Sequence, residues 1–181
     1  LGALIAWNLD NGDKRIQFVN GMAANDPVST LQIWKFVIDR YPGEGGTCVF
    51  FNSRDDRPVR TRQMIELTLK EIKPDHFIIR GDKLKSTLSR LAYHSPATKI
   101  QIIRLNDDVE STVNALVDLP HDTLIYAIGN QVGAGQEILT QISKYRHMFT
   151  KGGQNYTTNL ILFNITLLPS NHQMRKLTSV I

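Results

Sequence analysis

The chain has 181 residues, of which 41% are hydrophobic and 21% charged, and its formal net charge is +4. These ordinary values predict one soluble globular domain with a core of normal size. The single cysteine, Cys48, excludes a disulfide framework, and no apolar run approaches the ~18 residues that a membrane-spanning helix requires. The basic pI of about 9.3 favours anionic partners such as nucleotides, acidic peptides or nucleic acid, without choosing among them.

Short apolar runs, rich in β-branched and aromatic residues, recur along the chain. Five of them have the composition of strands that are buried on both faces, namely residues 16–19, 47–51, 76–79, 100–105 and 124–128. A sixth run, residues 3–7, precedes Asp10-Asn11-Gly12, which is typical of a hairpin turn. We therefore expect residues 3–7 to form an antiparallel edge strand beside residues 16–19.

Helical periodicity alternates with these strands. Apolar residues recur at helical spacing over residues 31–41, 84–91, 109–117 and 138–145, and Asp26-Pro27 is a favourable start for the first of these helices. The alternation predicts an α/β fold with a doubly wound, mostly parallel sheet of about six strands and an antiparallel edge strand.

The alternation stops after His147. Residues 1–147 are therefore predicted to form the domain, and residues 148–181 an irregular tail or arm that contains the apolar segment 160–168. This segment fits an added edge strand, an oligomerisation arm that would give a homo-oligomer, or a piece that docks on a missing domain. Because the chain begins with Leu1 rather than Met, we expect it to be part of a longer protein.

The loop that joins the first buried strand to the first helix is the most informative stretch. Small residues let a ligand approach the backbone, and a helix N-terminus attracts anions. Ligands of open α/β sheets bind beyond the carboxyl ends of the strands, where this loop lies. The binding candidates here are Asn20, Asn25, Asp26, Ser29 and Thr30.

A second strand exit carries a dense group of charged side chains, and its binding candidates are Asn52, Arg54, Asp56, Arg57 and Arg60. The three arginines are three residues apart, so part of the run can share one helical face. Guanidinium groups bind phosphates and carboxylates in bidentate fashion. The alternative is a solvated helix start with local Arg–Asp pairs.

A third strand exit contributes Gly129 and Asn130, which open a glycine-containing loop that would admit a ligand close to the backbone. The spacing of a dinucleotide fingerprint is absent, as are a phosphate-binding loop for ATP and the serine elbow of hydrolases. The histidines show no metal-ligand spacing, so no metal site is predicted, and no catalytic residue is assigned. Because most aromatic residues follow core periods, we expect no nucleic-acid partner.

Three of these segments together resemble the ligase subunit of bacterial poly-γ-glutamate synthase, in the Mur ligase superfamily. They are FVNGMAANDP at 18–27 with Ser29 and Thr30, NSRDDR at 52–57 with Arg60 and Thr61, and IGN at 128–130 with Gly133 and Gly135. The resemblance covers roughly residues 1–147 and implies a Rossmann-like C-terminal ligase domain.

The resemblance implies an enzyme that activates a carboxylate as an acyl phosphate and joins glutamate units through γ-amide bonds. ATP and Mg²⁺ would be bound mainly by an ATPase domain absent from this chain. Expected partners are glutamate or poly-γ-glutamate, that ATPase domain, and membrane subunits of the synthase. The expected location is the cytoplasm, at the inner face of the membrane. The alternatives are a stand-alone module that binds a nucleotide or phosphometabolite, and an interaction domain without catalysis.

Overall fold

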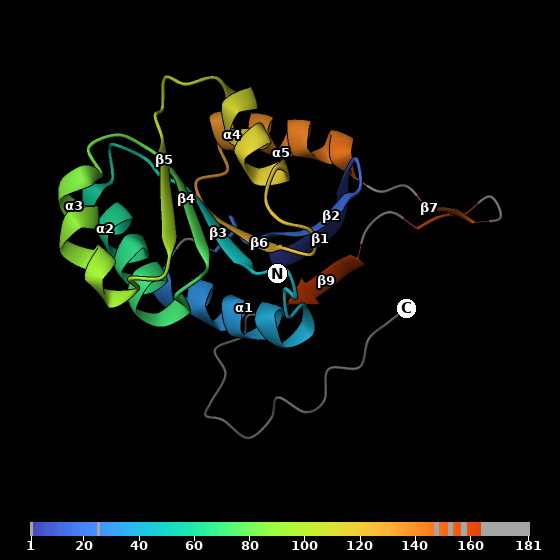
Figure 1. Ribbon diagram of the computed structural model, residues 1–181, viewed down its shortest axis with the longest axis horizontal. Coiled ribbons are helices and arrows are strands. Elements are labelled where there is room, and N and C mark those ends of the chain that lie inside the picture. Colours follow the sequence, from blue (N-terminus) through green and yellow to red (C-terminus); the bar gives the residue numbers. More distant parts are fainter. Residues whose placement is uncertain (1, 25, 147–148, 152–153, 157–158, 164–181) are drawn as a thin grey trace.

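A seven-stranded mixed sheet forms the centre of the protein (Figure 1). The computed structural model describes residues 2–24, 26–146, 149–151, 154–156 and 159–163. The strand order is β5-β4-β3-β6-β2-β1-β9. In chain order the strands are β1 (Gly2–Asn11), β2 (Lys14–Asn20), β3 (Thr47–Asn52), β4 (His76–Arg80), β5 (Lys99–Ile103), β6 (Leu124–Gly129) and β9 (Asn159–Phe163). A separate hairpin pairs β7 (Phe149–Lys151) with β8 (Gln154–Tyr156).

The five strands from β5 to β2 are parallel, which confirms the predicted fold class. Their register brings the carboxyl ends of four strands to one edge of the sheet. Asn52 at the end of β3 lies opposite Arg80 of β4 on one side and Gly129 of β6 on the other. Asn20 at the end of β2 lies opposite Ala127 of β6. The loops that the sequence marks as binding candidates therefore leave the sheet side by side.

The outer part of the sheet differs from the prediction in one respect. The pairing of β1 with β2 is antiparallel, as expected, and Gly12 supplies the positive φ of the hairpin turn. The expectation that this strand forms the edge is wrong, because β9 pairs antiparallel with its other side. Of the three alternatives for the apolar segment 160–168, the added edge strand holds for residues 160–163, and residues 164–168 lie outside the described residues.

Helices cover both faces of the sheet (Figure 1). One face carries α1 (Pro27–Arg40), α2 (Pro58–Leu67) with its π-helical extension η1 (Thr68–Ile72), and α3 (Lys85–Leu91) with the 3₁₀ turn η2 (Ala92–His94). The other face carries α4 (Val109–Val117) and α5 (Ala134–Ile142), which continues into the 3₁₀ turn η3 (Ser143–Tyr145). None of the helices in the described part of the chain has the length and hydropathy to cross a bilayer.

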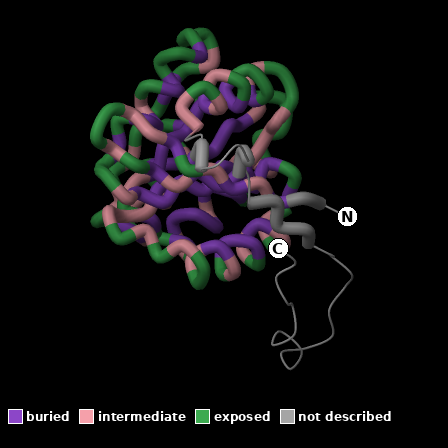
Figure 2. The backbone as a smooth tube through the Cα atoms, turned by 90° about the vertical axis from the view of Figure 1, so that its right-hand side faces the viewer, coloured by how far each residue is buried: buried purple, intermediate pink, exposed green. Residues whose placement is uncertain are grey.

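The core consists of two apolar clusters, one on each side of the sheet, and the central strands are buried between them (Figure 2). Phe50 and Tyr126 are fully buried on neighbouring strands and face opposite clusters. Cys48 is also fully buried, and this burial raises the pKa of its thiol far above the usual range. The thiol is therefore a core group that stays protonated, as its apolar neighbours in the sequence indicate.

Helix α1 begins where the sequence predicts. The Asp26 carboxylate accepts a hydrogen bond from the Ser29 backbone N–H at 2.9 Å, and Pro27 occupies the first helical position. The buried face consists of Thr30, Ile33, Trp34 and Val37. The apolar stripe that the sequence predicts consists of Leu31, Trp34, Ile38 and Tyr41. It lies next to the buried face, since Leu31 and Ile38 are only partly buried. The helix therefore faces the sheet with a rotation of about one residue from the expected orientation.

Candidate functional site

An open recess lies at the carboxyl ends of β3 and β6. It encloses about 390 Å³ of empty space, part of which is continuous with solvent. Six of the predicted binding residues line it, namely Asn52, Arg54, Arg57, Arg60, Gly129 and Asn130. The recess is also lined by Ala24, Phe51, Ser53, Thr61 and Met64. Apolar side chains thus form part of its wall, and guanidinium groups supply the charge.

The connectivity of the sheet explains why the recess lies here. The loop after β3 leads to α2 on one face, whereas the loop after β6 leads to α5 on the opposite face. Loops that leave two neighbouring parallel strands in opposite directions open a crevice between them. This topological switch point is the usual ligand site of doubly wound sheets, and the recess occupies it.

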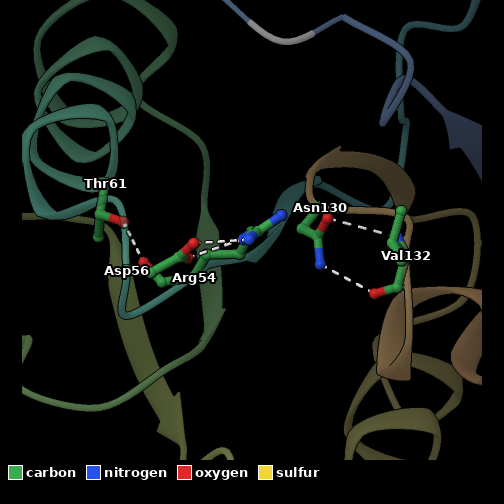
Figure 3. A network of polar contacts seen from close by, with 5 residues as sticks. All are labelled: Arg54, Asp56, Thr61, Asn130 and Val132. Atoms are coloured by element: carbon green, nitrogen blue, oxygen red, sulfur yellow. Dashed lines mark hydrogen bonds and ion pairs between the residues drawn. The ribbon is translucent and has the colours of Figure 1, made fainter.

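The arginine run divides into two kinds of side chain. Arg54 donates two hydrogen bonds to Asp56, from Nε to Oδ1 at 2.8 Å and from Nη2 to Oδ2 at 2.6 Å (Figure 3). This bidentate pair raises the pKa of the Arg54 guanidinium and lowers the pKa of the Asp56 carboxyl. Among the described residues, no carboxylate forms an ion pair with Arg57 or Arg60. Local Arg–Asp pairing therefore accounts for Arg54 and leaves two cationic groups at the recess without such a partner.

Helix α2 positions these arginines. Pro58 occupies its first turn, and the helix begins inside the arginine run, so Arg57 is the N-cap residue and Arg60 lies in the first turn. The Thr61 hydroxyl donates a hydrogen bond to the Arg54 backbone oxygen at 3.3 Å, which ties the loop to the helix. The N-terminus of α2 adds its partial positive charge to that of the guanidinium groups. The wall of the recess formed by α2 therefore attracts anions.

The opposite wall is held rigidly by two asparagines. The Asn52 side-chain amide donates to the Asn130 backbone oxygen at 2.6 Å, and the Asn130 backbone N–H donates to the Asn52 backbone oxygen at 2.8 Å. The Asn130 side chain in turn bonds both the N–H and the oxygen of Val132 and forms a tight turn (Figure 3). Both asparagine side chains are thus engaged within the protein. Their geometry indicates that they shape the recess, and a direct contact between either of them and a ligand stays a prediction.

Two glycines of this loop, Gly129 and Gly135, are required by packing. A Cβ at Gly129 would lie 2.4 Å from the Asn52 backbone oxygen, and φ at this position is +97°. A Cβ at Gly135 would lie 2.3 Å from the Asn130 backbone oxygen. Contacts this short with backbone atoms leave no room for a side chain. The close approach that glycine permits here is between two strand exits of the protein itself.

The floor of the recess is joined to β4 through Ser53, whose N–H and hydroxyl both donate to the Arg80 backbone oxygen, at 2.9 and 2.8 Å. The Arg80 side chain is almost fully buried and donates to the backbone oxygens of Leu105 and Asp107 and to the Thr112 hydroxyl. Arg80 thus anchors the loop before α4, and the predicted strand 100–105 ends at Ile103 because this anchored loop follows it.

Of the described residues in the loop after β2, only Ala24 lines the recess. The Asn20 side chain is buried and accepts a hydrogen bond from the Met22 N–H at 3.1 Å. Asp26 and Ser29 form the cap of α1, and the Ser29 N–H, with smaller contributions from the Ser29 hydroxyl, the Val28 N–H and Arg60, holds the pKa of the Asp26 carboxyl below its usual range. Asn25 lies outside the described residues. A ligand contact by any of these four residues stays a prediction.

Thr30 has a different environment from the other candidates. It is fully buried, and its backbone oxygen accepts a hydrogen bond from the Tyr126 hydroxyl at 3.1 Å. Trp34 follows it by one helical turn and packs against the Tyr126 ring. The spacing of four residues from Trp34 was the signal in the sequence that Thr30 belongs to the buried face of α1. The structure therefore separates Thr30 from the recess.

No group of three or more His, Cys, Asp or Glu side chains within the described residues has the arrangement of a metal site. The recess does fit an anionic group, because Arg57 and Arg60 line it without an ion-pair partner. What the described residues offer is therefore a carboxylate or phosphate site.

Fold and recess define an α/β domain with an arginine-lined recess at its switch point. The family model of the poly-γ-glutamate synthase CapB C-terminal domain matches residues 7–145. The chain therefore belongs to this family. PGA synthase CapB of Bacillus subtilis (strain 168) is 33% identical over 134 residues, which are 71% of this chain and 33% of that protein.

A second relative, capsule biosynthesis protein CapB of Bacillus anthracis, is 28% identical over 141 residues, or 78% of this chain and 30% of that protein. The chain thus spans about a third of the length of these relatives. Among solved structures, MurF from Acinetobacter baumannii matches 76% of this chain and 30% of its own, with 10% identity and a TM-score of 0.49. MurC from Thermotoga maritima matches 74% of this chain and 28% of its own, with 10% identity and a TM-score of 0.46.

Proposed function

We propose that this chain is the C-terminal domain of an ATP-dependent amide ligase that joins glutamate units through γ-amide bonds. Membership in the CapB C-terminal domain family supports the reaction class. The observation that carries a binding role is the recess, which Arg57 and Arg60 line without carboxylate partners. Guanidinium groups without such partners at an open site bind carboxylates or phosphates.

In the proposed reaction, a substrate carboxylate takes the γ-phosphoryl group of ATP to form an acyl phosphate, and ADP leaves. The amino nitrogen of the next glutamate then attacks the acyl carbon, phosphate departs, and the nitrogen loses a proton to give the amide. Arg57 and Arg60 hold a substrate carboxylate or neutralise phosphate charge, and Arg54 joins them when it is released from Asp56. Asn20, Asn25 and Asp26, near the α1 cap, orient the nucleotide or the incoming amine.

The triphosphate and Mg²⁺ belong, in this proposal, to an ATPase domain outside the chain, because the sequence contains no phosphate-binding loop and the described residues form no metal cluster. Water hydrolyses acyl phosphates, so the two domains close over the recess during the reaction. The proposed setting is the cytoplasm at the inner face of the membrane, where membrane subunits receive a poly-γ-glutamate product.

Two observations test this proposal. The coding sequence upstream of Leu1 should encode the phosphate-binding loop, and its absence would favour a stand-alone module that binds a nucleotide or phosphometabolite. The purified 181-residue chain should release no phosphate from ATP, whereas the chain joined to that ATPase domain should release phosphate in step with γ-amide formation. Robust ATP turnover by the chain alone would contradict the assignment of the triphosphate to another domain.

A further inference from the structure

The Arg54–Asp56 pair has the geometry that a bound carboxylate would adopt. The two nitrogens of the Arg54 guanidinium meet the two oxygens of Asp56 at 2.8 and 2.6 Å, so Asp56 occupies one complete edge of the fork. Arg54 lines the recess, whereas Asp56 is not among its lining residues. Figure 3 shows the guanidinium extended from the loop toward the Asn130 turn, with Asp56 at its other side.

Two properties make this contact exchangeable. The Arg54 and Asp56 side chains are 39% and 60% exposed, and exposed ion pairs are weak because water competes for both partners. The two residues are separated by a single residue in the chain, so Asp56 is always near Arg54 and returns as soon as a ligand leaves. A ligand carboxylate can therefore displace Asp56, and it competes with a tethered group when it does so.

We infer that Asp56 is an internal competitor that lowers the affinity of the recess for carboxylate ligands such as glutamate. This inference rests on the proposed function, since it takes the recess as the anion site. Only molecules with a released Arg54 bind the ligand at that guanidinium. The apparent dissociation constant is therefore the intrinsic one divided by the fraction of molecules in which Arg54 is released from Asp56. A ligand with one carboxylate merely replaces Asp56, whereas a second anionic group also engages Arg57 or Arg60. The competition raises the dissociation constants of mono- and dicarboxylates that bind Arg54 by the same factor.

The test is an NMR titration of the isotopically labelled 181-residue chain with glutamate. Binding is monitored through the Arg54 Nε–H signal and the backbone signals of the recess residues. The key variant is Asp56→Asn, and Asp55→Asn is the matched control, because Asp55 is the exposed neighbour with the same charge and no ion pair to Arg54. We expect Asp56→Asn to lower the dissociation constant about two- to fivefold, and Asp55→Asn by less than about 1.5-fold.

The Arg54→Ala background separates this mechanism from a general charge effect. Asp56→Asn should leave glutamate affinity unchanged when Arg54 is absent, because the competition then has no target. Equal gains from Asp56→Asn and Asp55→Asn, or a gain that persists with Arg54→Ala, would overturn the competitor role while leaving the recess as a binding site. The absence of saturable shifts at the recess in every variant would instead overturn the binding role itself. Asp56→Ser serves as a second variant, and thermal unfolding confirms that each variant is folded.

Discussion

Asn52 and Asn130 join the ends of two neighbouring parallel strands by a reciprocal pair of hydrogen bonds: the Asn52 side-chain amide donates to the Asn130 backbone oxygen, and the Asn130 backbone N–H donates to the Asn52 backbone oxygen. Asn52 is 3% exposed, so its amide cannot exchange this partner for water. The pair fixes the distance between the arginine loop and the β6–α5 turn. Stability and site geometry are therefore coupled at this junction.

Replacing Asn52 with alanine should lower the free energy of unfolding by about 1–3 kcal/mol, because the Asn130 oxygen loses a buried donor. Urea denaturation measures this difference. The control is Asn106→Ala, at an exposed turn position, which should change stability by less than about 0.5 kcal/mol. Equal stability of the two variants would show that the junction contributes little.

Substitution of Gly135 by alanine should destabilise the protein by about 1–3 kcal/mol, since the new Cβ would lie 2.3 Å from the Asn130 backbone oxygen. The exposed neighbour Gln136 is the control, and Gln136→Ala should be close to neutral. Thermal unfolding compares the two. A fully stable Gly135→Ala protein would mean that this glycine is not needed for packing. That result would favour a role for Gly135 in the approach of a ligand to the backbone.

The Asp26 cap makes the stability of α1 depend on pH. The Asp26 carboxyl has a pKa below the ordinary value of 3.8 in the folded state, mainly because of the Ser29 N–H. It therefore contributes stability at pH values above 3.8, and this stability is lost as the pH falls through the lower pKa of the folded state. Asp26→Ala should therefore cost about 1 kcal/mol at neutral pH and progressively less in acid. Urea unfolding across this range tests the sign. Asp26→Asn, which keeps an acceptor without the titrating group, should retain most of the stability, and a gap between wild type and Asp26→Ala that widens in acid would contradict this account.

The fold could be predicted largely because buried parallel strands and amphipathic helices leave local patterns. Residues 47–51 contain almost only apolar side chains, and β3 covers Thr47–Asn52. Contacts between distant segments left no such trace. The pairing of β9 with β1 joins the two ends of the described chain, and Arg80 ends β5 by binding the loop that follows it. Such long-range contacts override local pattern.

The site could be predicted in part. Residues at the exits of β3 and β6 meet in the recess because parallel strands end at one edge, which is a property of the topology. The sequence could not distinguish a ligand-facing amide from one engaged internally, as for Asn130, nor separate Arg54 from Arg57 by their partners. Those differences depend on distances of a few tenths of an ångström. The sequence did not indicate that Phe51 and Met64 line the recess, because apolar side chains of this kind usually belong to the core.

The central claim is that the arginines of the recess bind the anionic groups of the substrate. It is tested most directly in the ligase that contains this domain, by the rate of glutamate-dependent phosphate release with Arg57→Ala and Arg60→Ala. The control is Arg62→Ala, which removes an exposed arginine of the same helix that does not line the recess. We predict that each recess variant lowers kcat/KM about 10- to 100-fold, as expected for the loss of a charged hydrogen bond, while Arg62→Ala stays within about twofold of wild type. Wild-type rates in Arg57→Ala and Arg60→Ala, with their folding intact, would contradict the claim.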